Sequence, residues 1–96
     1  MAIRFEWNSG KAARNAAKHG VTFEEASTVF GDALSITIAD PSHSDEEDRW
    51  VTIGSSDRGR VLVVVHLDRF DALRLISARK ADRREREAYE EAISKR

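Results

Sequence analysis

Hydrophobic and polar residues alternate with two different periods over the first twenty positions. Ile3, Phe5 and Trp7 are separated by single charged residues, which is the period of a half-buried strand. Across Ser9–His19 the alanines recur at helical spacing, and Gly20 then stands where helices often end in a left-handed residue. The chain is therefore expected to begin with a short strand and a helix.

A second helix is predicted to end at Gly31. Thr22 and Glu25 have the spacing of a capping box, in which each side chain bonds to the backbone N–H of the other residue. Apolar residues follow at spacings of three and four, at Phe23, Ala26 and Phe30. This pattern predicts a helix that buries one face.

After Gly31 the hydrophobic period becomes that of strands. Strands are predicted at Leu34–Ala39, Trp50–Ser55, Arg60–Leu67 and Leu73–Ala78, and a last helix begins at Lys80. Short loops make consecutive strands antiparallel neighbours. The expected fold class is α+β: an N-terminal strand, two helices, a four-stranded antiparallel meander and a C-terminal helix, with the helices on one face of the sheet.

Alternation along the last strand assigns its side chains to two faces. Leu75, Ser77 and Arg79 are predicted on one face, and Arg74 on the other. Arg79 would then lie at the rim of the sheet. One of the two arginines could face a substrate while the other pairs with an acidic neighbour.

Length and composition favour one domain spanning residues 1–96. The longest apolar run, Val61–Val65, is too short to cross a bilayer, and the N-terminus lacks the apolar stretch of a signal peptide. The chain has no cysteine, which excludes disulfides and thiolate metal sites. A cytoplasmic protein without membrane contact is expected.

Charge is unevenly distributed along the chain, although the net charge is only −1. Residues 1–48 contain four Lys and Arg against nine Asp and Glu, whereas residues 49–96 contain twelve against eight. Any contact with nucleic acid must therefore use a local basic patch rather than the total charge.

Cations gather where the last helix is expected to begin. They are Arg79, Lys80, Arg83, Arg84 and Arg86. Free amides and arginines at a helix N-terminus can form a phosphate site. The alternative is a solvated basic turn balanced by Asp82, Glu85 and Glu87, and the sequence favours neither reading.

Histidine titrates closest to neutral pH and is a candidate for proton transfer. His43 lies in a polar loop and could reach a ligand, although it could also have no role. His19, beside Lys18 in the last turn of a helix, is expected to complement the helix dipole. His66 is expected to be buried with its hydrogen bonds satisfied.

The acidic run Asp45–Asp48 raises the alternative of a magnesium or manganese site with His43. Four consecutive acids point in different directions, so a solvated loop is favoured, and one of its acids could orient Arg49. Tyr89 is expected to pack on the sheet with its hydroxyl satisfied. No metal and no cofactor are expected.

Short motifs along nearly the whole chain resemble those of BrnT-type toxins. They are Phe5-Glu6-Trp7-Asn8, Lys11-Ala12 with Asn15, Lys18-His19-Gly20-Val21, Phe23-Glu24-Glu25-Ala26, Val29-Phe30, His43-Ser44, Asp48-Arg49, Ile53-Gly54, Gly59-Arg60, Ile76-Ser77-Ala78-Arg79-Lys80-Ala81, Glu85-Arg86 and Tyr89-Glu90-Glu91. The departure at Asn8-Ser9, where Asp-Pro is common, still caps a helix. The resemblance implies a RelE-like fold and a ribonuclease toxin of a type II toxin–antitoxin pair. It also implies an antitoxin with a ribbon-helix-helix domain, through which the complex would bind operator DNA and repress its own operon.

RNA cleavage by attack of the 2′-hydroxyl needs proton transfer and cations on the phosphorane, but no metal. His43 is the candidate acid or base, and Arg49 and Arg79 are the candidates for stabilising the phosphorane. The candidates for positioning phosphates are Lys11, Lys18, His19, Arg60, Arg83 and Arg86. The rival hypotheses are a non-catalytic module or co-repressor that binds an acidic antitoxin segment, and a metal-dependent nuclease.

Overall fold

The computed structural model describes residues 3–41 and 48–95. Its helices are α1 (Ser9–His19), α2 (Phe23–Thr28) and α3 (Arg83–Ser94), with a single turn of 3₁₀ helix, η1 (Val29–Gly31), after α2. Its strands are β1 (Phe5–Glu6), β2 (Ile36–Ala39), β3 (Arg49–Ser55), β4 (Val61–Arg69) and β5 (Ala72–Lys80). The predicted order of strand, two helices, four strands and helix is confirmed.

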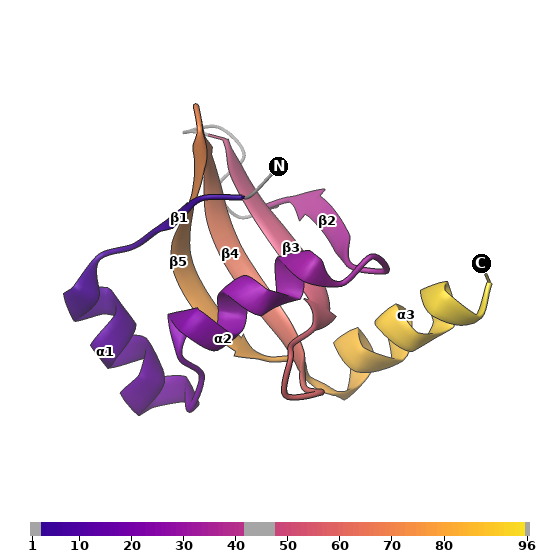
Figure 1. Ribbon diagram of the computed structural model, residues 1–96. Coiled ribbons are helices and arrows are strands. Elements are labelled where there is room, and N and C mark those ends of the chain that lie inside the picture. The colour runs from indigo at the N-terminus through magenta and orange to yellow at the C-terminus, as the bar shows by residue number, and fades with distance from the viewer. Residues whose placement is uncertain (1–2, 42–47, 96) are drawn as a thin grey trace.

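All five strands belong to one sheet with the order β1-β5-β4-β3-β2. The four strands from β2 to β5 form the predicted antiparallel meander. Strand β1 lies parallel to β5, with Phe5 opposite Leu73, so the start of the chain closes the sheet edge beside β5. In Figure 1 α2 crosses in front of the sheet and α1 lies beside β5.

The hydrophobic core lies between α2 and the sheet. The segment from Val21 to Val29, which includes α2, and the strands β4 and β5 supply its residues. They are Val21, Phe23, Ala26, Val29, Leu62, Val64, Leu75 and Ala78. Burying each of the larger side chains contributes about 1.5–3 kcal/mol. The core therefore holds α2, β4 and β5 together as a rigid frame.

The predicted capping box at the start of α2 forms only in part. The Oγ1 atom of Thr22 accepts a hydrogen bond from the backbone N–H of Glu25 at 3.0 Å, as expected. The carboxylate of Glu25 does not return to the backbone of Thr22, because it is buried in an ion pair with Arg60. The tertiary contact replaces the local one.

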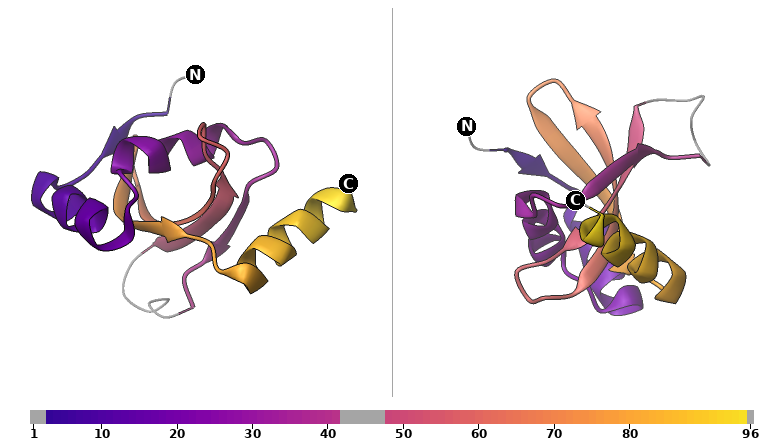
Figure 2. Two further views of the ribbon diagram at one scale, coloured as in Figure 1. Left: turned by 90° about the horizontal axis from the view of Figure 1, so that it is seen from below. Right: turned by 90° about the vertical axis from the view of Figure 1, so that its right-hand side faces the viewer.

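Helix α3 does not share the face of the sheet that α2 covers. Its first turns adjoin Ile53 in β3, whose side chain lies on the opposite face from its buried neighbour Thr52. Figure 2 (left) shows α2 and α3 on different sides of the sheet. The prediction of one helical face is therefore wrong for α3. The predicted burial of Tyr89 is confirmed, and its hydroxyl donates to Asp32.

A β-bulge changes the faces predicted for β5. The register between β4 and β5 shifts at Val65 and His66, so the two strands pair Val65 with Ser77 but His66 with Leu75. An extra residue in one strand reverses the alternation of side chains. Leu75 is therefore buried in the core, whereas Ser77 and Arg79 lie on the other face; the prediction that Leu75 shares their face is wrong.

A short polar chain crosses the interior of the sheet. The Oγ1 atoms of Thr37 and Thr52 are 2.7 Å apart, and Thr52 Oγ1 lies 2.8 Å from Nε2 of His66. His66 is 4% exposed and packs edge-on against Phe30. Its Nδ1 has no hydrogen-bond partner among the described residues, so the prediction of a fully satisfied histidine holds for one ring nitrogen only. Burial lowers the pKa of His66, although nearby Asp68 acts in the opposite direction.

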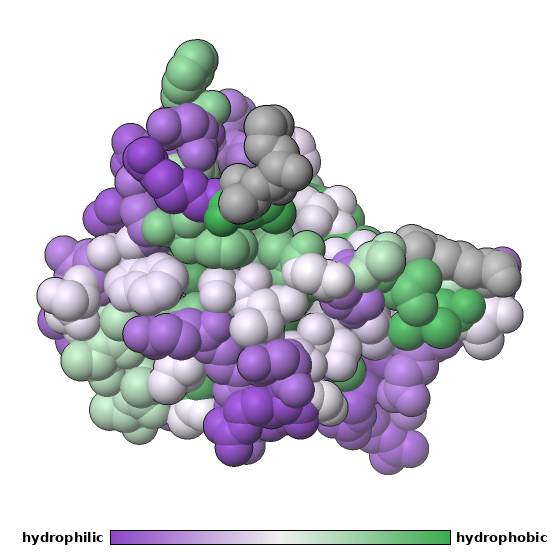
Figure 3. Space-filling model, viewed as in Figure 1, coloured by the Kyte–Doolittle hydropathy of each residue, from purple (hydrophilic) through white to green (hydrophobic). Residues whose placement is uncertain are grey.

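The molecular surface is mixed in character. Seen from the α2 side, hydrophobic residues appear in separate areas among hydrophilic ones (Figure 3). None of the helices in the described part of the chain is long and apolar enough to cross a membrane.

Candidate functional site

One hollow lies on the face of the sheet turned away from α2, and we call it the sheet groove. Its volume is about 410 Å³, within the range of small-molecule sites. Its apolar floor is formed by Val51, Ile53, Val63 and Val65. The charged side chains that line it are Asp40, Arg49, Arg79 and Glu85. Two predicted phosphorane-stabilising residues, Arg49 and Arg79, therefore line the same groove although they come from different strands.

Arg79 is held in the sheet groove by Glu85 of α3. Its Nη1 and Nη2 atoms donate to the two carboxylate oxygens of Glu85, each at 2.8 Å. These bonds lower the pKa of Glu85 and raise that of Arg79, so both groups remain charged near neutral pH. The guanidinium is thus oriented before any ligand arrives, and a phosphate must share it with Glu85 or displace Glu85.

Arg49 has a looser carboxylate partner. Its Nε lies 3.4 Å from Oδ2 of Asp40, close enough for an ion pair. This nitrogen is buried and makes no hydrogen bond among the described residues. The sequence suggested that one acid of the run Asp45–Asp48 could orient Arg49. Only Asp48 of this run is described, and the ion pair of Arg49 with a described residue is with Asp40.

A second hollow lies along α1, and we call it the α1 groove. It is lined by Lys11, Arg14, Asn15, Lys18, His19, Ile76 and Ser77. Three of the predicted phosphate-positioning residues, Lys11, Lys18 and His19, are therefore brought together. Ser77 lines both the α1 groove and the sheet groove, so the two hollows adjoin at this residue of β5.

Asn15 attaches α1 to β5. It is 7% exposed, and its Nδ2 donates to the carbonyl oxygens of Ala78 at 2.8 Å and of Val21 at 3.0 Å. Its Oδ1 accepts from the backbone N–H of Ala78 at 3.1 Å. The amide thereby occupies backbone groups of β5 that an adjoining strand would otherwise use. Because Ala78 precedes Arg79, this contact sets the position of α1 relative to the arginine.

Arg60 lies outside both grooves, although it was predicted to position phosphate. Its Nε donates to Oε2 of Glu25 at 2.9 Å, and Ser56 donates to the same oxygen at 2.7 Å. The Arg60 hydrogen bond lowers the pKa of Glu25. Since the Glu25 side chain is only 4% exposed, the pair joins α2 to the loop between β3 and β4. The geometry gives Arg60 a structural role.

The N-terminus of α3 is already occupied by its own side chains. Asp82 accepts from the backbone N–H of Glu85 at 2.8 Å, and Glu85 accepts from that of Asp82 at 2.8 Å. This capping box places two carboxylates where a phosphate would have to bind. Of the predicted cations here, Arg83 pairs with Glu87 at 3.0 Å, and Arg86 is exposed and lines neither groove. The geometry favours a solvated, balanced basic turn.

His43 and the first three acids of the run, Asp45, Glu46 and Glu47, lie outside the described residues. Within residues 3–41 and 48–95 no three His, Asp or Glu side chains are grouped so that they could hold a metal ion. The candidate proton-transfer residue therefore stays a prediction. So does the alternative metal site of the loop.

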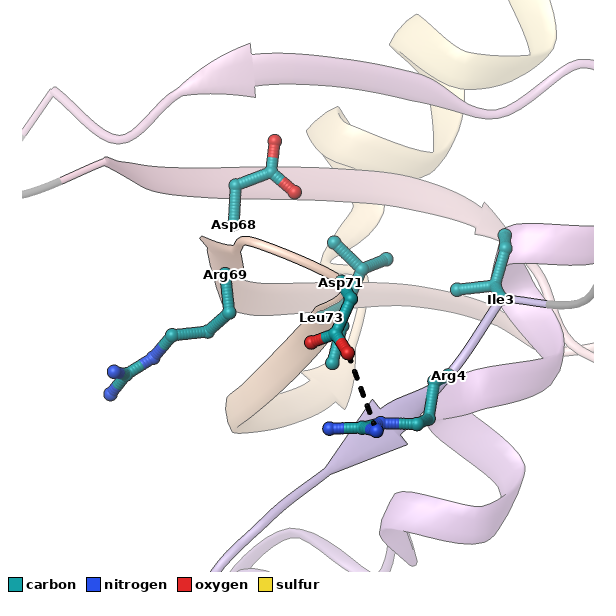
Figure 4. A pocket seen from close by; sticks show the side chains of 7 residues that line it. Ile3, Arg4, Asp68, Arg69, Asp71 and Leu73 are labelled. Atoms are coloured by element: carbon teal, nitrogen blue, oxygen red, sulfur yellow. Dashed lines mark ion pairs between the residues drawn. The ribbon is translucent and has the colours of Figure 1, made fainter.

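A further hollow lies at the β4–β5 hairpin (Figure 4). Arg4 and Asp71 form an ion pair of 3.4 Å at this hollow. Arg69 comes within 3.9 Å of Glu6 of β1, which also pairs with Arg74 at 3.8 Å. With its cations paired at an exposed site, this hollow offers little to an anionic ligand.

Several residues of the two grooves were not singled out from the sequence. Arg14, Ser77, Asp40 and Glu85 were given no binding role, and Asn15 entered only as part of a motif. Arg14 could have been found, because it stands three residues after Lys11 and four before Lys18 on a helix. The position of Glu85 beside Arg79 depends on how α3 packs, which no local pattern shows.

The described chain is thus a small α+β protein with one antiparallel meander and two adjoining, arginine- and lysine-lined hollows. Residues 7–85 match the model of a family described as the ribonuclease toxin, BrnT, of type II toxin–antitoxin systems. The chain belongs to this family. Membership implies an RNA target and an antitoxin partner.

A crystal structure of the Brucella abortus ribonuclease toxin BrnT has a similar fold. The two structures superpose with a TM-score of 0.67 and share 22% sequence identity, covering 85% of this chain and 100% of that one. At this identity the likeness supports the fold alone. Among curated protein sequences, none matches the chain.

Proposed function

We propose that this chain acts as one BrnT-like domain, residues 1–96, and cleaves RNA without a metal by attack of a 2′-hydroxyl on the adjacent phosphorus. The observation that carries the proposal is the presence of Arg49 and Arg79 in one groove. Two guanidinium groups in a partly enclosed groove can stabilise the extra negative charge of a phosphorane.

Arg79 is the stronger candidate of the two for the phosphorane. Both of its terminal nitrogens already bind a pair of oxygens 2.8 Å away, in the forked arrangement that also suits two phosphate oxygens. Glu85 therefore keeps Arg79 in a productive orientation in the free protein. When substrate binds, one or both terminal nitrogens of Arg79 donate to phosphate oxygens instead of to Glu85. The lowered pKa of Glu85 makes it a weak proton acceptor.

Proton transfer is assigned to His43. A histidine can act as base for the 2′-hydroxyl or as acid for the leaving 5′-oxygen near neutral pH. The position of His43 in the chain also supports this role. His43 comes after Asp40 and Pro41 and before Arg49, and these three residues line the sheet groove. A substrate in this groove would therefore lie near both ends of the loop that carries His43.

The proposed partner is an antitoxin with a ribbon-helix-helix domain that neutralises the toxin. Operator DNA would be bound only through the antitoxin, and the pair would act in the cytoplasm, where the RNA target is found. Family membership supports an antitoxin as such, and the resemblance noted in the sequence supports its type.

The apolar floor of the sheet groove favours a second candidate function. Val51, Ile53, Val63 and Val65 could receive a protein segment, with Arg49 and Arg79 staying paired to their carboxylates. The chain would then be a non-catalytic binding module or co-repressor. This alternative requires that the purified protein leave RNA intact.

The decisive experiment is incubation of the purified protein with RNA, with and without EDTA, followed by analysis of the product ends. Cleavage that resists EDTA and leaves 2′,3′-cyclic phosphate and 5′-hydroxyl ends is expected. A 2′-deoxy substitution at the cleaved nucleotide should abolish it. Cleavage that EDTA stops would support the metal-dependent alternative, and no cleavage would support the binding module.

A further inference from the structure

Helix α1 carries a row of cations that have no carboxylate partner among residues 3–41 and 48–95. Lys11, Arg14 and Lys18 are exposed and stand three and four residues apart, so they follow one side of the helix. Ser9–His19 contains no acidic residue, and none of the three cations forms an ion pair with any described residue.

Some exposed cations elsewhere on the described surface are paired within one helix, although Lys80, Arg84 and Arg86 form no ion pair with a described residue. In α3, Arg83 pairs with Glu87, and Lys95, just beyond its end, pairs with Glu91, each four residues apart. Like charges three or four residues apart destabilise a helix, and an anion bound along α1 would remove this repulsion. The row is therefore a site where an anionic ligand gains binding energy.

The α1 groove adjoins the sheet groove. Ser77 lines both hollows, and Asn15 fixes α1 against Ala78, the residue before Arg79. An anion long enough to contact the row on α1 can therefore continue over Ser77 toward Arg79. A single phosphate could not span this path, but a polymer could.

We propose that the α1 groove is a phosphate-binding track for single-stranded RNA, with Arg14 between Lys11 and Lys18 as its central contact. The track guides the strand over Ser77 into the sheet groove. This inference rests on the proposed function and names the path of its substrate. An acidic protein segment fits less well, because Ile76 is the single apolar residue among the described residues lining the groove, and protein interfaces have an apolar core.

The test measures binding of a fully 2′-O-methylated single-stranded RNA, which cannot undergo 2′-hydroxyl attack, by fluorescence anisotropy over a range of salt concentrations. The variant is Lys11→Gln/Arg14→Gln/Lys18→Gln. The matched control, Arg4→Gln/Arg69→Gln/Lys95→Gln, removes the same charge from exposed positions outside both grooves. Thermal melts confirm that both variants are folded.

We expect the α1 variant to bind RNA roughly tenfold or more weakly at physiological salt, because three phosphate contacts are lost. Its plot of log affinity against log salt should be shallower by about 2, from a slope of about 0.7 per phosphate on a single strand. The control variant should keep the affinity and slope of the unchanged protein.

Equal affinities of the α1 variant and the unchanged protein would overturn the track, even if RNA is cleaved. An equal loss in the control would also overturn it, since general charge would then explain binding. Poly-glutamate bound as tightly as RNA, and lost with it in the α1 variant, would overturn the choice of RNA. If the unchanged protein binds RNA with the expected slope but never cleaves it, the track stands and the proposed catalysis fails.

Discussion

Asn15 hydrogen-bonds to both backbone groups of Ala78, 63 residues further along the chain. The Asn15 amide accepts from the N–H and donates to the carbonyl of one strand residue, as the backbone of a neighbouring strand would. It joins the helix that bears the cation row to the strand that bears Arg79.

Replacing Asn15 with alanine should lower the free energy of unfolding by about 3 kcal/mol, because buried backbone groups of Ala78 and Val21 lose their partners. Chemical denaturation measures this change. Arg14→Ala, at the adjacent exposed position, serves as the control and should change stability by no more than about 0.5 kcal/mol. Similar values for the two variants would show that the amide contacts contribute little.

Arg79→Ala should reduce RNA cleavage by about 10³-fold, since a charge-stabilising group is removed from the transition state. Glu85→Gln keeps an oxygen for the capping box but removes the carboxylate charge, and it should retain activity within about tenfold. Initial rates of RNA cleavage compare the two. A severe loss in Glu85→Gln with little effect of Arg79→Ala would mean that the carboxylate, not the arginine, takes part in the reaction.

His43→Ala should lower the cleavage rate by about 10²-fold, a typical contribution of a proton-transfer group, and by less than Arg79→Ala. The melting temperature should not change, which separates a catalytic effect from unfolding. An unaltered rate would remove His43 from the mechanism.

Stability should fall as the pH is lowered below about 6.5, the ordinary pKa of histidine, because His66 has a lowered pKa in the folded protein. The unfolded chain then binds a proton that the folded protein resists, and the loss continues until the pH reaches the folded pKa. Denaturant unfolding between pH 8 and pH 5 measures the slope. His66→Gln should flatten it in this window; an unchanged slope would assign the effect to other groups.

Much of the fold could be predicted because its signals are local. The alternation at Phe5 and Trp7, the helical spacing after Ser9 and the end at Gly20 depend on residues close in sequence, and the structure confirms each element. The meander followed from short loops in the same way. Predictions failed where a residue has a partner distant in sequence. The Glu25 carboxylate was predicted to complete a capping box, but it pairs with Arg60, 35 residues away.

The faces of β5 show why periodicity alone was not sufficient. A strict period of two placed Leu75 on the same face of the strand as Ser77. The bulge opposite Val65 and His66 reverses the alternation between them. A bulge is decided by the pairing of two strands, and a single strand carries no sign of it. The same bulge turns Ser77 toward the two grooves.

By itself, the sequence determined the elements, their order, the family motifs and the residue types able to hold phosphate. The tertiary structure decided which cations are available: Arg60 is tied to Glu25, Arg79 is oriented by Glu85, and the row on α1 has no described partner. The physical reason is that helix and strand signals arise from neighbouring residues, whereas the pairing of charges depends on distances that only the packed chain defines.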